Sequence, residues 1–179
     1  MKILILCGSP HKNGTTNALT ESFIKGIHQD RHVIKKIWLQ DKKLSPCMGC
    51  MYCKNHGNKC VLQDDAADIL KDVYEADLIV FVSPLYYFAM TSQLKIIIDR
   101  FFAVNNTLRE QKKKAILLTA GSDTDEWAMD GIKAHYETML RYLHWTSVGE
   151  IYAYGCSSKE MLADTDYPER AMELGKSIG

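Results

Sequence analysis

The stretch that decides the fold is KILILCGSPHKNGTTN, residues 2–17. Residues 2–7 form a continuous apolar run that ends at a Gly-Ser-Pro triplet, which predicts a strand buried on both faces. Small polar residues follow and lead into TNALTESFIKGIH (16–28), where apolar side chains recur at helical spacing. A buried strand, a polar loop and an amphipathic helix in this order are the first half of a βαβ unit.

The same alternation continues to the end of the sequence. Further strands are predicted over 32–39, 77–83, 113–121 and 146–155, and further helices over 64–76, 91–104, 126–143 and 158–178. Five strands that alternate with five helices predict a parallel sheet covered on both faces through right-handed crossovers. We expect a single α/β domain over residues 1–179, from which a cysteine-rich loop departs at 44–63.

Composition argues against several classes of function. The chain has 22 basic and 22 acidic residues, so its net charge gives no reason to expect binding to nucleic acid or to an anionic membrane. No apolar run reaches the roughly 18 residues that span a bilayer, and the N-terminus lacks a signal-peptide pattern. We therefore expect a cytoplasmic protein whose cysteines stay reduced. The run Lys112-Lys113-Lys114 is interpreted as a solvated entrance to the fourth strand.

A loop suited to phosphate follows the first strand. Gly8 and Gly14 let the backbone turn, and short donors are offered by Ser9, Thr15, Thr16 and Asn17. The N-terminus of the next helix adds free N–H groups and positive partial charge. The pattern is neither GxxxxGK[ST] nor GxGxxG, and it lacks a phosphate-binding lysine. An N-capped loop without a ligand would look similar, but open α/β sheets bind ligands at this edge.

Three consecutive aromatic residues follow the third strand, within Pro84-Leu85-Tyr86-Tyr87-Phe88. A flat heteroaromatic ring needs such walls, although each aromatic alone is equally well explained by closing the core. In a parallel sheet of order 2-1-3-4-5, strands one and three are neighbours at the switch point. The phosphate loop and the aromatic loop then border one crevice, which describes a site for flavin mononucleotide (FMN).

Three motifs, GSPHKNGTTN, CMGCMYC…CVLQDD and SPLYYFAMTSQLKIIIDRF, together resemble the NADPH-dependent FMN reductase family, and more narrowly its iron–sulfur flavoprotein-like branch. The resemblance runs from residue 2 to about residue 155. It implies a flavodoxin-like three-layer sandwich with a five-stranded parallel sheet of order 2-1-3-4-5. It also implies FMN as cofactor, NAD(P)H as electron donor, and a homodimer or homotetramer with FMN near a subunit interface.

The resemblance also assigns cofactor-binding residues. The FMN phosphate would be held by Ser9, His11, Asn13, Gly14, Thr15 and Thr16. The isoalloxazine ring would be bordered by Pro84, Leu85, Tyr86, Tyr87 and Phe88, and reached on its other side by Ala120, Gly121 and Ser122. Relatives often carry arginine where this chain has His11, so this contact departs from the family pattern.

Four cysteines form a CxxCxxCx6C pattern: Cys47, Cys50, Cys53 and Cys60. This spacing suits ligation of a [4Fe–4S] cluster by four thiolates, whereas zinc usually uses two separated CxxC pairs. The iron–sulfur flavoproteins that the chain resembles use a compact motif of this kind. From the residues alone, a cluster, a zinc ion and reduced thiols all stay open. Cys7 and Cys156, at strand ends, are expected to pack in the core.

These features predict a flavin-dependent oxidoreductase. Electrons would pass from NAD(P)H or a reduced donor to a small acceptor, such as a quinone, flavin, azo or nitro compound, with a [4Fe–4S] cluster as a further carrier. No catalytic side chain is assigned, because the cofactor carries the chemistry. Two alternatives are an electron-transfer flavoprotein without its own substrate and a thiol or metal redox sensor. The neutral net charge argues against the first, since such carriers often use a charged docking face.

Overall fold

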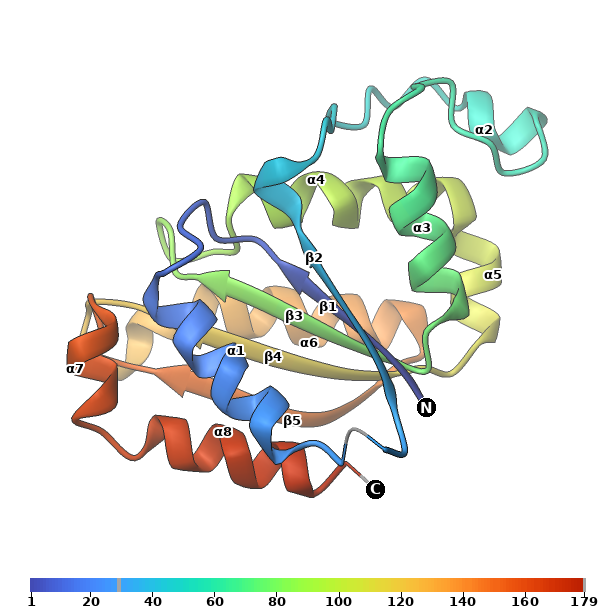
Figure 1. Ribbon diagram of the computed structural model, residues 1–179. Coiled ribbons are helices and arrows are strands. Elements are labelled where there is room, and N and C mark those ends of the chain that lie inside the picture. The colour runs from blue at the N-terminus through green and yellow to red at the C-terminus, as the bar shows by residue number, and fades with distance from the viewer. Residues whose placement is uncertain (29, 179) are drawn as a thin grey trace.

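In the computed structural model, which describes residues 1–28 and 30–178, five parallel strands form one sheet of order β2-β1-β3-β4-β5 (Figure 1). The strands are β1 (Lys2–Cys7), β2 (Val33–Trp38), β3 (Leu78–Pro84), β4 (Lys114–Ala120) and β5 (Thr146–Ala153). The predicted strand order is confirmed, and each strand boundary lies within two residues of its expected position.

Burial explains the position of each strand in the sheet. In β1 and β3 nearly every side chain is buried, as expected for central strands covered on both faces. In β2 only Ile37 is buried, and the strand carries the exposed Lys35 and the half-buried Lys36. Lysines on an edge strand discourage pairing with another chain, so β2 is suited to the sheet edge.

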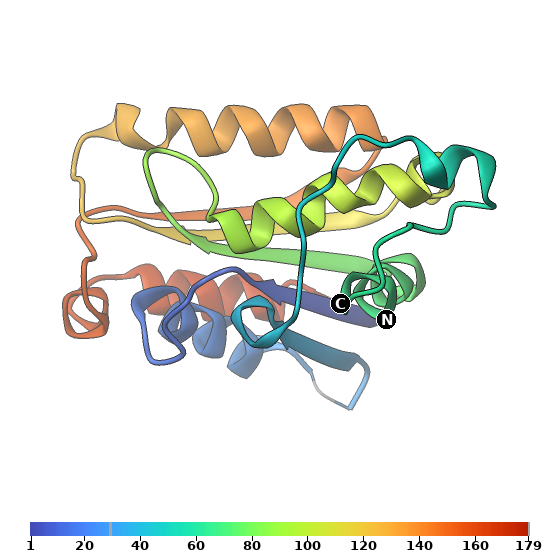
Figure 2. The ribbon, with the colours of Figure 1, turned by 90° about the horizontal axis from the view of Figure 1, so that it is seen from above.

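Helices cover both faces of the sheet and give three layers (Figure 2). One face packs against α1 (Thr15–Gly26), α7 (Lys159–Ala163) and α8 (Tyr167–Lys176). The other packs against α3 (Ala66–Glu75), α4 (Ser92–Arg100), α5 (Asn105–Glu110) and α6 (Asp130–Leu143). Across residues 1–28 and 30–178, none of the helices has both the length and the apolar character needed to cross a membrane.

Some short elements were not expected. They are the one-turn helix α2 (Tyr52–Asn55) and the 3₁₀ turn η1 (Leu39–Asp41). The helix predicted over 126–143 begins with the 3₁₀ turn η3 (Glu126–Met129), and the 3₁₀ turn η2 is Phe101–Val104. The helix predicted over 91–104 is α4 followed by η2, and α5 extends the segment to Glu110. The helix predicted over 158–178 is divided into α7 and α8. Pro168 lies in the first turn of α8, where its missing N–H costs no hydrogen bond.

The interpretation of residues 112–114 as a solvated entrance is wrong for Lys113. This side chain is 5% exposed, and its Nζ donates hydrogen bonds to the carbonyl oxygens of Tyr74, at 2.8 Å, and of Ala76. Burial lowers the pKa of Lys113 to about 8, although the charge of Asp77 opposes this shift. The amine satisfies carbonyl groups at the C-terminal end of α3 and thereby connects that helix to the start of β4.

Candidate functional site

Loops from the carboxyl edge of the sheet meet around a cleft of about 240 Å³. They follow β1, β3 and β4, as the strand order predicts, and the segment after β5 also contributes. The cleft is lined by Ser9, His11, Gly14, Thr15, Thr16, Pro84, Leu85, Tyr86, Ala120, Gly121, Ser122, Cys156 and Ser157. Segments that are distant in sequence are therefore brought to one space.

The loop after β1 presents the positive end of α1 to this cleft. Gly14 is the N-cap residue and makes no side-chain capping hydrogen bond, and the first turn of α1 holds no acidic residue. Thr15 and Thr16, the first two residues of α1, line the cleft. The positive end of the helix dipole is thus not neutralised by a carboxylate in its own first turn, which suits it to an anion such as phosphate.

The other polar residues of this loop have different positions. Ser9 Oγ accepts the N–H of His11 at 3.1 Å and donates to the carbonyl oxygen of the same residue, so this hydroxyl shapes the loop. Asn17 Oδ1 accepts a hydrogen bond from Lys36 Nζ on β2. Asn13 is exposed. Neither Asn13 nor Asn17 lines the cleft, whereas the other five residues predicted for the phosphate do.

The loop after β3 is a tight turn with unusual backbone angles. Tyr86 and Ala89 exchange two backbone hydrogen bonds of 3.1 Å. The two residues that lie between them in the sequence have positive φ angles, 47° for Tyr87 and 63° for Phe88. Glycine or asparagine normally occupies such positions, because a side chain there is strained by about 1–2 kcal/mol. Tyr86 lines the cleft, whereas Tyr87 is 98% exposed. The structure therefore brings only one of the three predicted aromatics to the cleft wall.

Tertiary contacts hold this turn in place. The Phe88 ring packs on Trp127 with a centroid distance of 5.2 Å. Gly131, in the first turn of α6, allows the backbone of the turn to approach, because a Cβ atom there would lie 2.5 Å from the carbonyl oxygen of Phe88. At the base of the loop, a Cβ atom on Gly8 would lie 2.5 Å from Thr91 Oγ1. Glycine is therefore needed where β1 passes the start of α4.

Two cleft residues were missed from the sequence, Cys156 and Ser157. Cys156 donates its backbone N–H to the carbonyl oxygen of Gly121 at 2.8 Å, and burial raises the pKa of its thiol. It is 3% exposed, so the expected burial is confirmed, as it is for Cys7. The sequence does contain a feature that could have identified these two residues. The stretch YGCSS (154–158) follows the last strand, just as small polar residues follow the first strand at the phosphate loop.

The cysteine-rich loop at 44–63 projects away from the sheet between η1 and α3 (Figure 1). Its two ends are joined at a neck formed by Lys43, Ser45, Asp64 and Asp65. Lys43 N–H donates to Asp65 Oδ2 at 2.8 Å, and Asp65 N–H donates back to the Lys43 carbonyl oxygen at 3.1 Å. Ser45 N–H donates to Asp64 Oδ2 at 2.9 Å. The loop therefore leaves and re-enters the body of the molecule at one point.

Arg100, the last residue of α4, fixes the neck from inside. Its side chain is 1% exposed, and it donates to Asp64 through Nη1 at 2.8 Å and Nη2 at 3.1 Å. Nη1 also donates to the carbonyl oxygen of Ser45. Burial would raise the pKa of Asp64, but the hydrogen bonds from Arg100 and from the backbone of Ser45 and Ala66 hold it below its ordinary value. The clamp is a buried bidentate ion pair.

The four predicted cysteines line a single small pocket of about 20 Å³. Cys53 is buried, Cys60 is half-buried, and Cys47 and Cys50 are exposed. Among the residues that the structure describes, no three His, Cys, Asp or Glu side chains are arranged to share a metal ion. The predicted ligand set is thus brought around one pocket, but metal binding would require its thiols to turn toward one another.

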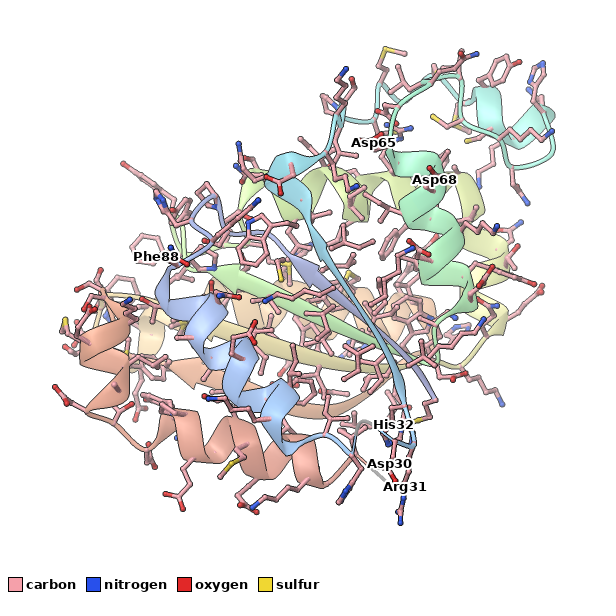
Figure 3. The ribbon with its side chains drawn as sticks, in the orientation of Figure 1. Asp30, Arg31, His32, Asp65, Asp68 and Phe88 are labelled. Carbon is pink, nitrogen blue, oxygen red and sulfur yellow. The ribbon has the colours of Figure 1, made fainter. Side chains whose placement is uncertain are left out.

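The cleft and the four-cysteine pocket lie at opposite ends of α4. Thr91, the N-cap residue of this helix, bonds to Gly8 beside the cleft, and Arg100 at the other end holds the neck. The nine residues of α4 separate these ends by roughly 13 Å. Figure 3 shows the same separation, with Phe88 beside the carboxyl edge of the sheet and Asp65 at the base of the cysteine loop. A single chain therefore does not place its cysteines against its own cleft.

The fold and the cleft define a flavodoxin-like α/β protein in which the N-terminus of α1 and the ring of Tyr86 border one cleft at the sheet's carboxyl edge. The sequence matches the NADPH-dependent FMN reductase family over residues 1–158, and the chain belongs to this family. The resemblance inferred from the three motifs is confirmed.

Individual relatives agree with this assignment. An iron-sulfur flavoprotein of Methanocaldococcus jannaschii is 40% identical over 100 residues, which cover 56% of this chain and 51% of that protein. This match therefore spans about half the length of that relative. An iron-sulfur flavoprotein of Archaeoglobus fulgidus is 28% identical over 180 residues, covering 99% of this chain and 79% of that protein.

A solved structure shows the same fold. The NAD(P)H:quinone oxidoreductase from Methanothermobacter marburgensis superposes with a TM-score of 0.75 at 17% identity, covering 99% of this chain and 96% of that chain. At this identity the similarity concerns the fold alone.

Proposed function

We propose that the protein is an FMN-dependent oxidoreductase that takes electrons from NAD(P)H or another reduced donor and passes them to a small acceptor. The proposed acceptor is a quinone, a flavin, an azo compound or a nitro compound. The observation that carries this proposal is the cleft, where the un-neutralised end of α1 and the ring of Tyr86 border one space. Membership of the FMN reductase family supports it.

The residues of the cleft fit an FMN molecule by their chemistry. The first turn of α1, with Gly14, Thr15 and Thr16, would hold the phosphate through backbone N–H groups and hydroxyls. Pro84, Leu85 and Tyr86 would border one side of the ring system, and Ala120, Gly121 and Ser122 would border another. FMN, when bound, supplies the electron-transfer chemistry, so that the protein's task is to bind and orient it.

We further propose that the cysteine-rich loop carries a [4Fe–4S] cluster on Cys47, Cys50, Cys53 and Cys60. The spacing of these residues and their shared pocket support this assignment. The names of the archaeal relatives also support it. Within the described part of the chain, a buried N–H of Arg100 beside this pocket has no partner, which is consistent with an anionic group at this place.

We also propose that residues 1–179 act as one FMN-binding domain within a homodimer or homotetramer. The four cysteines lie away from the cleft of their own chain, and a second copy would bring another cleft closer to them. Light scattering on the purified protein measures this assembly directly. A monomer at working concentrations would contradict it.

The decisive experiment is an absorption spectrum of protein purified without oxygen, with flavin, iron, sulfide and zinc measured on the same sample. We expect bound FMN, and oxidation of NADPH or NADH when a quinone is added. A protein that binds no FMN, even after FMN is supplied, would refute the central proposal. Cys50→Ala should lose the iron and keep the FMN, whereas Met48→Ala, in the same exposed loop segment, should keep both. Equal iron in both variants would refute the cluster.

A further inference from the structure

Arg100 has a donor that the ion pair does not use. Its two Nη atoms bind Asp64 and Ser45, but in the part of the chain that the structure describes its Nε has no hydrogen-bond partner. The side chain is 1% exposed, so water is not available to replace the partner. A buried, charged N–H donor without an acceptor is costly, which indicates that an acceptor belongs beside it.

The space beside Arg100 is the four-cysteine pocket. Arg100 lines this pocket together with all four cysteines, and it is the single charged residue among the described residues that line it. The Arg100 side chain and the Cys60 thiol therefore border the same small space.

Metal-bound thiolates are the acceptors that this arrangement lacks. Four thiolates around a divalent metal or an iron–sulfur cluster leave a net negative charge on the centre, and their sulfur atoms accept hydrogen bonds. The apolar residues that complete the pocket, such as Phe102 and Val61, offer no other compensation for that charge. A fixed cation in the wall of the pocket would reduce the cost of enclosing such a centre.

We propose that Arg100 is the built-in counter-charge of the four-cysteine centre. Its Nη atoms hold the neck through Asp64, and its Nε–H donates to the sulfur of Cys60 in the metal-bound state. Arg100 thereby acts as a positioning residue that favours a four-thiolate centre of net negative charge. This inference rests on the proposed four-cysteine centre and is independent of FMN.

A purely structural role for Arg100 is the alternative. In that case the residue only closes the neck, and its contribution depends on the bidentate contact with Asp64. Lysine keeps the positive charge but cannot reproduce the planar fork of arginine. Arg100→Lys therefore separates the two roles, because it preserves the counter-charge and loses the bidentate contact.

The test uses Co²⁺ as the probe, titrated under anaerobic conditions into the full-length, reduced, metal-free protein. Cobalt bound by four thiolates has a characteristic absorption, from which the dissociation constant is obtained. We expect Arg100→Gln to weaken binding by about tenfold or more, because a hydrogen bond to a charged group is lost. Arg100→Lys should weaken binding less than Arg100→Gln does, because lysine keeps the positive charge. Arg141→Gln, which removes an exposed arginine from α6, should have no effect.

Three outcomes would overturn the proposal. Equal binding by the wild type and Arg100→Gln would show that the charge is irrelevant, and equal losses in Arg100→Gln and Arg100→Lys would show a structural role. A wild type without the four-thiolate spectrum would remove the centre itself. If Arg100→Gln fails to fold, the neutral pair Arg100→Gln with Asp64→Asn replaces it. FMN content, measured on the same samples, reports separately on the proposed oxidoreductase function.

Discussion

Thr91 Oγ1 donates a 2.8 Å hydrogen bond to the carbonyl oxygen of Gly8, across a separation of 83 residues. The same oxygen accepts the N–H of Leu94 and so caps α4. The backbone N–H of Thr91 donates in turn to Ser83 Oγ, at the end of β3. The loops after β1 and β3, which form two sides of the cleft, are therefore tied together at their bases by one residue.

Thr91→Val should weaken both the fold and the cleft. Valine keeps the shape of threonine but removes the cap and the bond to Gly8, so we expect a loss of about 1–3 kcal/mol in the free energy of unfolding. FMN affinity should fall as the two loops separate. Urea unfolding and fluorescence titration with FMN measure the two effects. Ser92→Ala, at the exposed neighbouring position, is the control, and unchanged FMN binding in Thr91→Val would contradict the coupling.

Thr15→Asp should separate phosphate binding from helix stability. A carboxylate in the first turn of α1 favours the helix dipole by about 0.3–1 kcal/mol, so the melting temperature should not fall. The same charge should repel the phosphate and lower FMN affinity, while riboflavin, which has no phosphate, should bind as before. Ser92→Asp, in the first turn of α4, should stabilise without changing FMN affinity. Equal losses for FMN and riboflavin would argue against a phosphate site at α1.

The ion pair between Asp64 and Arg100 should make the free energy of unfolding depend on pH. Because the folded-state pKa of Asp64 is below its ordinary value, its contribution is complete above about pH 4, the ordinary aspartate range. The contribution is lost as the pH falls through the lowered pKa. We therefore expect the difference in unfolding free energy between the wild type and Asp64→Asn to shrink below about pH 4. Asp68→Asn, at an exposed position of α3 labelled in Figure 3, should show no such trend.

Lys113→Met should destabilise the junction of α3 and β4. The carbonyl oxygens of Tyr74 and Ala76 would lose their donor, at a cost of about 1–3 kcal/mol. The lowered pKa of about 8 adds a pH signature. Between about pH 8 and about 10.4 the unfolded chain keeps a proton that the folded chain releases, so wild-type stability should rise with pH relative to Lys113→Met. Lys114→Met, at an exposed position, is the control for denaturation across this range.

Much of the fold could be predicted because parallel strands are buried on both faces. The runs at residues 2–7 and 77–83 are apolar almost without interruption, and the alternation with helices favours the doubly wound strand order. That order brings the loops after β1 and β3 together at the switch point, so the position of the cleft followed from topology.

The unpredicted details depend on distant partners. Tyr87 and Phe88 adopt positive φ angles against their local preference, because Gly131 and Trp127 hold the turn. Arg100 looks like an ordinary basic residue at a helix end, but it is buried and paired with Asp64. This partner lies 36 residues earlier, so the pairing cannot be read from the local sequence. Such contacts leave no periodic signal in the sequence.

The closed neck has a consequence for how this protein can change over evolutionary time. Because the two ends of the loop are also joined where Ser45 N–H donates to Asp64, the segment between Ser45 and Asp64 can be shortened while its ends stay adjacent and Arg100 keeps its partner. No strand and no residue that lines the cleft lies within this segment, which the structure describes throughout. One flavodoxin-like scaffold can therefore change the length and the cysteine content of this insert by replacing a single segment.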